Sequence, residues 1–197
     1  IMKRLLLILI LTFSLQSWTK ADDIRDFEIE GISIGDSLLE FKTKKFISKR
    51  LEESSTFYYK NKKYAVIGLS INSENYDAVS ATIKPKDKDY IIYAIEGRIK
   101  YNNNNQDCLD KKKQISKEIL TSFPKKKYQY FDGKHDFDKK GNSLYYANIL
   151  YLSGGNIELY CFDWSNEITT TKGMKDELKV IITETNFKKW INTNAWK

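Results

Sequence analysis

The sequence is poor in the residues that most metal and nucleic-acid sites need. Its 197 residues include one His, two Cys, two Pro and only four Arg, of which Arg4 is the first. The single histidine, His135, excludes any zinc site built from several histidines. Because arginine makes the bidentate contacts with bases and phosphates that lysine cannot make, we expect no nucleic-acid partner.

The remaining composition is that of a globular protein. Hydrophobic residues make up 41% and charged residues 30% of the chain, which excludes disordered and collagen-like classes. A chain of this length usually forms one domain that buries about 70% of its unfolded surface. Lys, Asn, Ile, Tyr and Phe have AT-rich codons, so genome composition explains the basic charge as well as an anionic partner does. We interpret the lysine runs 111–113 and 125–127 as solvated surface.

Residues 1–21 have the pattern of a secretory signal peptide. A basic start at Lys3 and Arg4 precedes residues 5–15, which are almost entirely apolar. Eleven apolar residues span about 16 Å as a helix, about half of a bilayer's hydrocarbon core. That mismatch argues against an uncleaved membrane anchor, so we expect no stable membrane span in the mature chain.

The cleavage site is expected between Ala21 and Asp22, because residues 19–21 place small side chains at positions −3 and −1. Cleavage there removes three of the 33 basic residues and none of the 26 acidic ones, which lowers the net charge from +7 to +4. The sequence therefore predicts a periplasmic or secreted protein whose mature part, residues 22–197, is a single domain.

The two cysteines fit an exported protein. An even number of cysteines in an oxidising compartment favours a disulfide. Cys161 alternates with Ile157 and Leu159 on the apolar side of a predicted strand, and Cys108 opens a predicted helix with an apolar stripe. A bridge across 53 positions would stabilise the fold by about 4 kcal/mol in the chain-entropy model. Two free buried thiols are the alternative.

Hydrophobic periodicity and turn signals predict an α+β order of elements. Ser37 and Glu40 have the spacing of a capping box. Residues 153–155, Ser-Gly-Gly, predict a tight hairpin. The predicted elements are a strand or extended segment 27–34, a helix 37–49, strands 57–59, 64–71, 79–83 and 91–101, a helix 107–123, strands 128–131, 144–152, 156–162 and 178–185, and a short helix 187–196.

This order predicts an antiparallel sheet with helices packed on one face. In the strand 91–101, we expect Ile91, Tyr93 and Ile95 to share the side that faces the core. The halves 27–101 and 107–197 each contain a helix and a run of strands, so they are interpreted as two possible repeats of one helix-plus-strands unit.

Two resemblances can be named on quoted residues. Residues 23–41, Asp-Ile-Arg-Asp-Phe-Glu-Ile-Glu-Gly-Ile-Ser-Ile-Gly-Asp-Ser-Leu-Leu-Glu-Phe, resemble the opening of uncharacterised small exported proteins of low-GC marine bacteria, which have no assigned activity. Within them, Ile-Gly-Asp-Ser-Leu-Leu-Glu at 34–40 is distantly similar to the helix-opening motif of SmpA/OmlA and beta-lactamase-inhibitor-like modules. The Met or Thr usual in that motif is missing here. The second resemblance implies that the chain binds another protein in the periplasm.

One segment, residues 132–142, offers candidates for catalysis. His135 is the only imidazole and could act as a general base oriented by Asp132, Asp136 or Asp138. Neither a G-x-S-x-G elbow nor a catalytic cysteine accompanies it, so a solvent-exposed loop histidine is the simpler interpretation.

The same segment matches a calcium loop only in part. Asp136, Asp138 and Gly141 occupy the first, third and sixth positions of an EF-hand loop. The fifth position is Lys140 and the twelfth is Ala147, so a cation replaces one ligand and the bidentate ligand is missing. We therefore predict a hairpin loop with no metal and no cofactor.

Tyrosine, present 13 times, is the remaining signal. Where two neighbours in a strand are both aromatic, one of them must lie on the side away from the core, so an aromatic surface for a peptide or glycan is conceivable. Strand propensity also enriches tyrosine. The two explanations differ in whether the outward rings form one patch. The tyrosines concerned are Tyr58, Tyr59, Tyr128, Tyr130, Tyr145, Tyr146 and Tyr151.

Three functions follow as hypotheses. The first is a non-catalytic exported binding or envelope-assembly protein, expected as a monomer, whose partner is an envelope protein or peptide. The second is a periplasmic hydrolase that uses His135 with nearby carboxylates. The third is a peripheral protein held on the anionic envelope surface by its lysines, which would dissociate as salt is raised.

Overall fold

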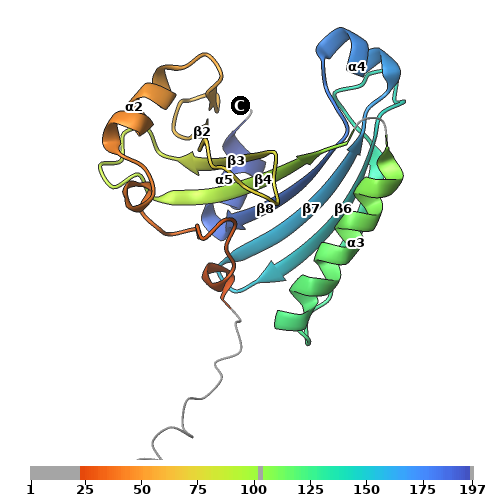
Figure 1. Cartoon of the computed structure of the whole chain (residues 1–197), viewed down its shortest axis with the longest axis horizontal. Helices are drawn as coiled ribbons and strands as arrows, with labels where there is room; N and C mark the ends of the chain where they lie inside the picture. The colour runs from red at the N-terminus through yellow and green to blue at the C-terminus, as the bar shows by residue number, and fades with distance from the viewer. Residues whose placement is uncertain (1–22, 102–103, 196–197) are drawn as a thin grey trace, which may run out of the picture.

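A computed structural model of the chain describes residues 23–101 and 104–195. The predicted signal peptide and the cleavage site between Ala21 and Asp22 lie outside these residues. The described part forms one eight-stranded antiparallel sheet with four α-helices (Figure 1), which confirms the α+β class. Its strands are β1 (Phe57–Tyr58), β2 (Ala65–Gly68), β3 (Ala78–Ile83), β4 (Ile92–Lys100), β5 (Gln129–Lys134), β6 (Leu144–Leu152), β7 (Gly155–Asp163) and β8 (Glu177–Glu184).

The sheet consists of two four-stranded meanders in the order β1-β2-β3-β4-β8-β7-β6-β5. They meet at β4 and β8, where Ile95 lies opposite Ile182. Helix α2 (Lys44–Glu52) precedes the first meander and α3 (Asn105–Ser122) precedes the second. Each half therefore has a helix followed by four strands, and the interpretation of the halves as repeats stays a prediction.

One face of the sheet carries α2 and α3, and we call it the covered face. Side chains alternate along each strand, so Ile95, Leu159 and Ile182 all point to this face and are fully buried. Helix α3 packs against β7 and β8 and runs alongside the strands of the second meander (Figure 1). Cys108 of α3 and Cys161 of β7 form the predicted disulfide, with an S–S distance of 2.01 Å.

The opposite face carries α5 (Thr185–Asn194), and we call it the open face. Phe187 of α5 is buried against Tyr64, Tyr93 and Ala94, which point away from the main core. The prediction that all helices pack on one face is therefore wrong. The helix itself was predicted from the sequence, but the face it binds depends on where the aromatic residues of β4 and of the segment before β2 project.

The predicted helix 37–49 is two elements. Residues Leu38–Glu40 form a single 3-10 turn (η2), and α2 begins only at Lys44. Thr43 starts it, because the Thr43 side chain accepts a hydrogen bond from the backbone N–H of Phe46 at 3.2 Å. The Ser37 hydroxyl accepts from Leu39 N–H and donates to the carbonyl of Asp89, so it ties the turn to the sheet instead of starting a long helix.

Two further local predictions are corrected, and one helix was missed. Residues 27–34 contain no named strand, because Glu30 and Gly31 both have positive φ and close a tight turn between Ile29 and Ile32. The register between β3 and β4 shifts at Tyr93, because Thr82 pairs with Ala94 whereas Ile83 pairs with Ile92. The shift places Tyr93 on the open face instead of the core side. Helix α4 (Asn166–Lys172) was not predicted, since its sequence Asn-Glu-Ile-Thr-Thr-Thr-Lys contains a single large apolar residue.

Candidate binding surface

His135 lies directly after β5, among aromatic rings. Its ring centroid is 4.5 Å from that of Trp164 and 5.5 Å from that of Phe162. The Nδ1 atom accepts a hydrogen bond from the backbone N–H of Phe137 at 3.1 Å, so the neutral ring carries its proton on Nε2. His135 is therefore half-buried, not a solvent-exposed loop residue.

The environment of His135 keeps the ring neutral. Burial, supported by the nearby positive charge of Lys179, lowers the pKa of His135, while Asp136 and Asp138 act in the opposite direction. The two carboxylates act only through their charge: within the described residues, no hydrogen bond joins the His135 ring to Asp132, Asp136 or Asp138. The predicted orienting carboxylate is therefore not in place.

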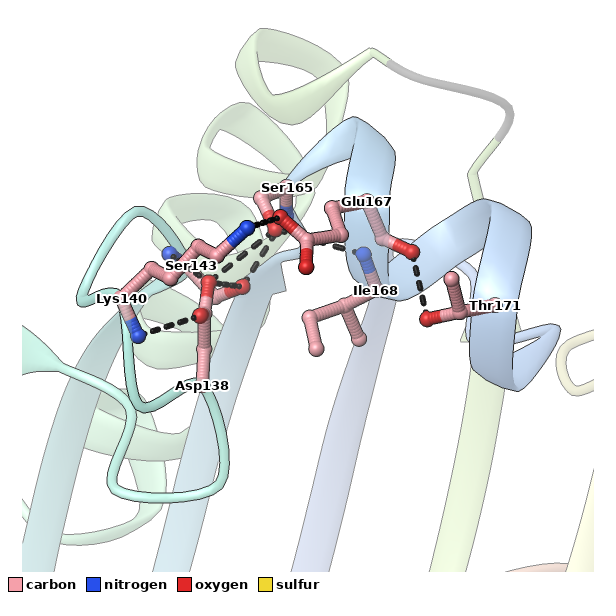
Figure 2. Close-up of polar contacts among 7 residues, drawn as sticks. All are labelled: Asp138, Lys140, Ser143, Ser165, Glu167, Ile168 and Thr171. Carbon is pink, nitrogen blue, oxygen red and sulfur yellow. Dashed lines mark hydrogen bonds and ion pairs between the residues drawn. The ribbon is translucent and has the colours of Figure 1, made fainter.

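Asp138 instead organises the loop between β5 and β6 (Figure 2). Its carboxylate accepts hydrogen bonds from the Ser143 N–H at 2.9 Å, the Ser143 hydroxyl at 2.7 Å, the Ser165 hydroxyl at 3.0 Å and the Lys140 N–H at 3.0 Å. These bonds, first of all the one from the Ser143 hydroxyl, lower the pKa of Asp138 to about 2. Since Ser165 also caps the start of α4, Asp138 joins the loop to that helix.

The calcium-like spacing does not produce a calcium loop. Asp138 already has four donors, and Lys140, at the fifth position, forms an ion pair with Glu167 of α4 at 2.7 Å. Ala147, at the twelfth position, lies within β6. In residues 23–101 and 104–195, no group of three acidic, histidine or cysteine side chains could hold a metal ion.

A row of parallel aromatic rings runs along the open face of β7 and past its end. Tyr160 and Phe162 stack at 5.6 Å with planes 8° apart, and Phe162 and Trp164 stack at 5.8 Å with planes 16° apart. The Lys179 ammonium lies 5.2 Å from the centre of the Phe162 ring. We call Tyr160, Phe162 and Trp164, with His135 beside them, the aromatic row.

The aromatic row continues toward the edge of the sheet. Tyr145 of β6 lies opposite Phe162 and approaches Tyr160 at 6.5 Å between ring centres. Tyr151 of β6 and Phe131 of β5 project to the same face and are 52% and 43% exposed. Large partly exposed rings thus extend across β5, β6 and β7 on the open face of the sheet.

The tyrosines singled out in the sequence do not form this surface by themselves. Tyr128 is buried in the main core and Tyr130 projects to the covered-face side of β5. Tyr146 packs against the main core, and Tyr58 donates to the carbonyl of Leu51. Phe162 and Trp164, two of the three rings of the aromatic row, were not singled out in the sequence. A signal was present, because Cys161 was predicted to face the core and the alternating positions 160, 162 and 164 are all aromatic.

One of the lysines expected in solvent is buried. Lys112 of α3 is 8% exposed, and its ammonium donates to the backbone carbonyl of Tyr146 at 3.0 Å. Burial lowers its pKa to about 8, against the raising influence of Asp132. The interpretation of 111–113 as solvated surface is therefore wrong for its central residue, which helps to hold α3 on the sheet.

Comparison with known proteins finds no relative: no family model, no curated protein and no solved structure matches the chain. The two resemblances named above thus remain expectations. Across the part of the chain that the structure describes, no helix is long and apolar enough to cross a membrane.

Proposed function

We propose that the chain is an exported, non-catalytic binding or envelope-assembly protein, and that the aromatic row contacts an envelope protein or peptide. The observation that carries the proposal is the row itself: three stacked rings that stay partly exposed on the open face of the sheet. Aromatic side chains with apolar faces and polar edges are enriched where proteins meet partners. Their side chains also lose little conformational entropy when a partner binds.

The charges around the row support a protein or peptide partner. Lys179 forms an ion pair with Glu177 at 3.2 Å, and Lys188 forms one with Glu158 at 2.5 Å. Apolar rings bordered by paired charges resemble the apolar centre and polar rim of a protein interface. Export is supported by the Cys108–Cys161 disulfide, because such bonds persist in oxidising compartments.

Two observations favour binding over hydrolysis. The Nδ1 atom of His135 is occupied by a backbone N–H, and Asp138 is held by two serines and a backbone N–H of the loop. A general base in a hydrolase of the serine or cysteine type needs a nucleophile within hydrogen-bond reach and a group that orients it. The contacts of His135 in this structure are those of a packed ring.

The test is retention of a partner from envelope extracts. The wild-type protein, a Phe162→Ser variant and a Tyr130→Ser control are immobilised and compared at low and moderate salt. Tyr130 is an exposed ring on the covered-face side of β5, so it matches the substitution without touching the row. We expect a protein that wild type and Tyr130→Ser retain and Phe162→Ser loses at both salt concentrations.

Other outcomes of this test would contradict the proposal or favour electrostatic binding or hydrolysis instead. A partner lost equally from both variants, or kept by Phe162→Ser, would contradict the proposal. Release of all bound material from every variant at moderate salt would favour electrostatic binding through the lysines. A hydrolytic activity that His135→Ala abolishes while the fold is retained would favour the hydrolase.

A further inference from the structure

The open face contains a small pocket where α5 packs on the sheet, next to the aromatic row, since Glu158 lines the pocket and accepts a hydrogen bond from the Tyr160 hydroxyl. Its volume is about 140 Å³. The floor is Ala94 of β4, whose small side chain leaves space between Thr82 of β3 and Thr183 of β8, its two cross-strand neighbours. Phe187 and other residues of α5 line the opposite side.

The floor of this pocket is polar although it is buried. Ser80, Thr82 and Thr183 are 3%, 5% and 3% exposed. The Ser80 hydroxyl has no hydrogen-bond partner in the described structure, although it lines the pocket. Buried polar groups are nearly always hydrogen-bonded, so the unpaired Ser80 hydroxyl is free to bond a molecule that enters the pocket.

The charged groups that line the pocket are paired. Glu158 accepts hydrogen bonds from Lys188 Nζ at 2.5 Å, Asn156 Nδ2 at 2.5 Å and the Tyr160 hydroxyl at 2.6 Å. Glu96, directly opposite Ser80 in the sheet, lies 3.1 Å from the Nε atom of Arg98. Each carboxylate therefore has a cation beside it, so the site favours neither a cationic nor an anionic ligand.

We propose that this pocket binds a small neutral polyhydroxy compound. Hydroxyl groups both donate and accept, as a ligand must beside the hydroxyls of Ser80, Thr82 and Thr183 and the carboxylate of Glu96. The rings of Tyr59 and Phe187 and the side chain of Ile191 line the pocket and provide apolar contacts for the C–H groups of such a compound. None of the rings of the aromatic row lines this pocket, although Tyr160 contacts it through its hydrogen bond to Glu158.

The test is a titration of the purified protein followed by backbone amide NMR. The probes are glycerol, ribose and glucose as neutral polyols, with ethanolamine as a cation and glycolate as an anion. We expect at least one polyol to give saturable shifts centred on Ser80, Thr82, Ala94 and Thr183, and neither charged probe to do so. No saturable shift from any polyol, which would mean that water alone fills the pocket, overturns the proposal, as does equal binding of a charged probe.

Two variants locate the binding. Thr82→Val keeps the shape of the side chain and removes the hydroxyl, so it should weaken polyol binding at least tenfold. Thr121→Val, on the exposed side of α3, is the matched control and should leave it unchanged. Ala94→Leu should abolish binding by filling the pocket. Unchanged affinity in Thr82→Val contradicts the proposal even where Ala94→Leu fails to fold.

Discussion

The two faces of the sheet differ in how far their large side chains are covered. On the covered face, apolar side chains such as Leu159 and Ile182 are fully buried in the main core, and Asn148 donates to the Ser116 hydroxyl at 2.8 Å. On the open face, the Ser80 hydroxyl has no partner and large aromatic rings remain partly exposed. The covered face holds the main core, and the open face leaves large aromatic rings accessible at its surface.

The division follows from alternation along single strands. Leu159 and Cys161 of β7 point to the covered face and are fully buried, while Tyr160 and Phe162 between and beside them point to the open face and stay partly exposed. Adjacent residues of one strand therefore lie on different faces and differ in burial. Substitutions on the covered face should cost stability, and substitutions on the open face should cost binding.

The largest expected effect is that of the disulfide. The double variant Cys108→Ala, Cys161→Ala should lose about 4 kcal/mol of unfolding free energy, since the bond closes a 53-residue separation in the unfolded chain. Urea unfolding of wild type and variant measures the difference. A loss of less than about 1 kcal/mol would show that the covered face does not depend on this bond.

The next largest expected effect is a difference in unfolding free energy between variants of two β7 residues that point to opposite faces. Leu159→Ala leaves a cavity in the main core and should cost about 2–5 kcal/mol. Phe162→Ser, on the open face, should cost much less, because its ring is only partly buried. Urea unfolding of both variants gives the comparison. Equal losses would contradict the assignment of stability to one face.

A smaller effect concerns acid stability. The pKa of Asp138 is about 2 in the folded chain against an ordinary value of 3.8, so its contribution is fully present above about pH 4 and is lost as the pH falls through 2. Asp138→Asn should therefore lower the melting temperature at neutral pH and flatten its decline between pH 4 and pH 2. Asp23→Asn is a control with the same pKa and an exposed ion pair with Arg25, and it should have the lesser effect. If the melting temperature of Asp138→Asn falls as steeply between pH 4 and pH 2 as that of wild type, this account of the loop is contradicted.

The smallest expected effect is a change in the pKa of His135. Burial lowers the pKa of His135, so any stability it contributes is present above its ordinary value of 6.5 and is lost as the pH falls through the folded value. Trp164→Ala removes the closest ring and should raise the pKa of His135 toward its ordinary value. Imidazole proton NMR measures this titration. A pKa of His135 that stays unchanged in Trp164→Ala would contradict the proposed packing of the row.

Much of the fold was predictable because local patterns determine it. All eight strands overlap strands predicted from the sequence, and the hairpin at 153–155 follows from Gly154, whose φ of 84° favours glycine. The break before α2 was not predictable from periodicity, since apolar residues continue through 38–47 while Thr43 caps a new helix. The position of α5 depends on long-range packing against Tyr64 and Tyr93, which periodicity does not reveal.

The candidate sites were less predictable because they depend on register. His135 and Asp138 were correctly placed in one loop, but their separate hydrogen-bond networks arise from contacts with Phe137, Ser143 and Ser165. The pocket under α5 arises where Thr82, Ala94 and Thr183 meet across three strands. A single sequence does not specify which residues of distant strands lie opposite one another.

The most direct test of a binding open face is site-specific photo-crosslinking in cells. A photoreactive phenylalanine analogue is placed at Phe162 in one variant and at Tyr130 in another. The account predicts a discrete crosslinked partner from position 162 and none from position 130. Equal adducts from both positions, or an adduct from position 130 alone, would contradict the claim that the open face is the binding surface.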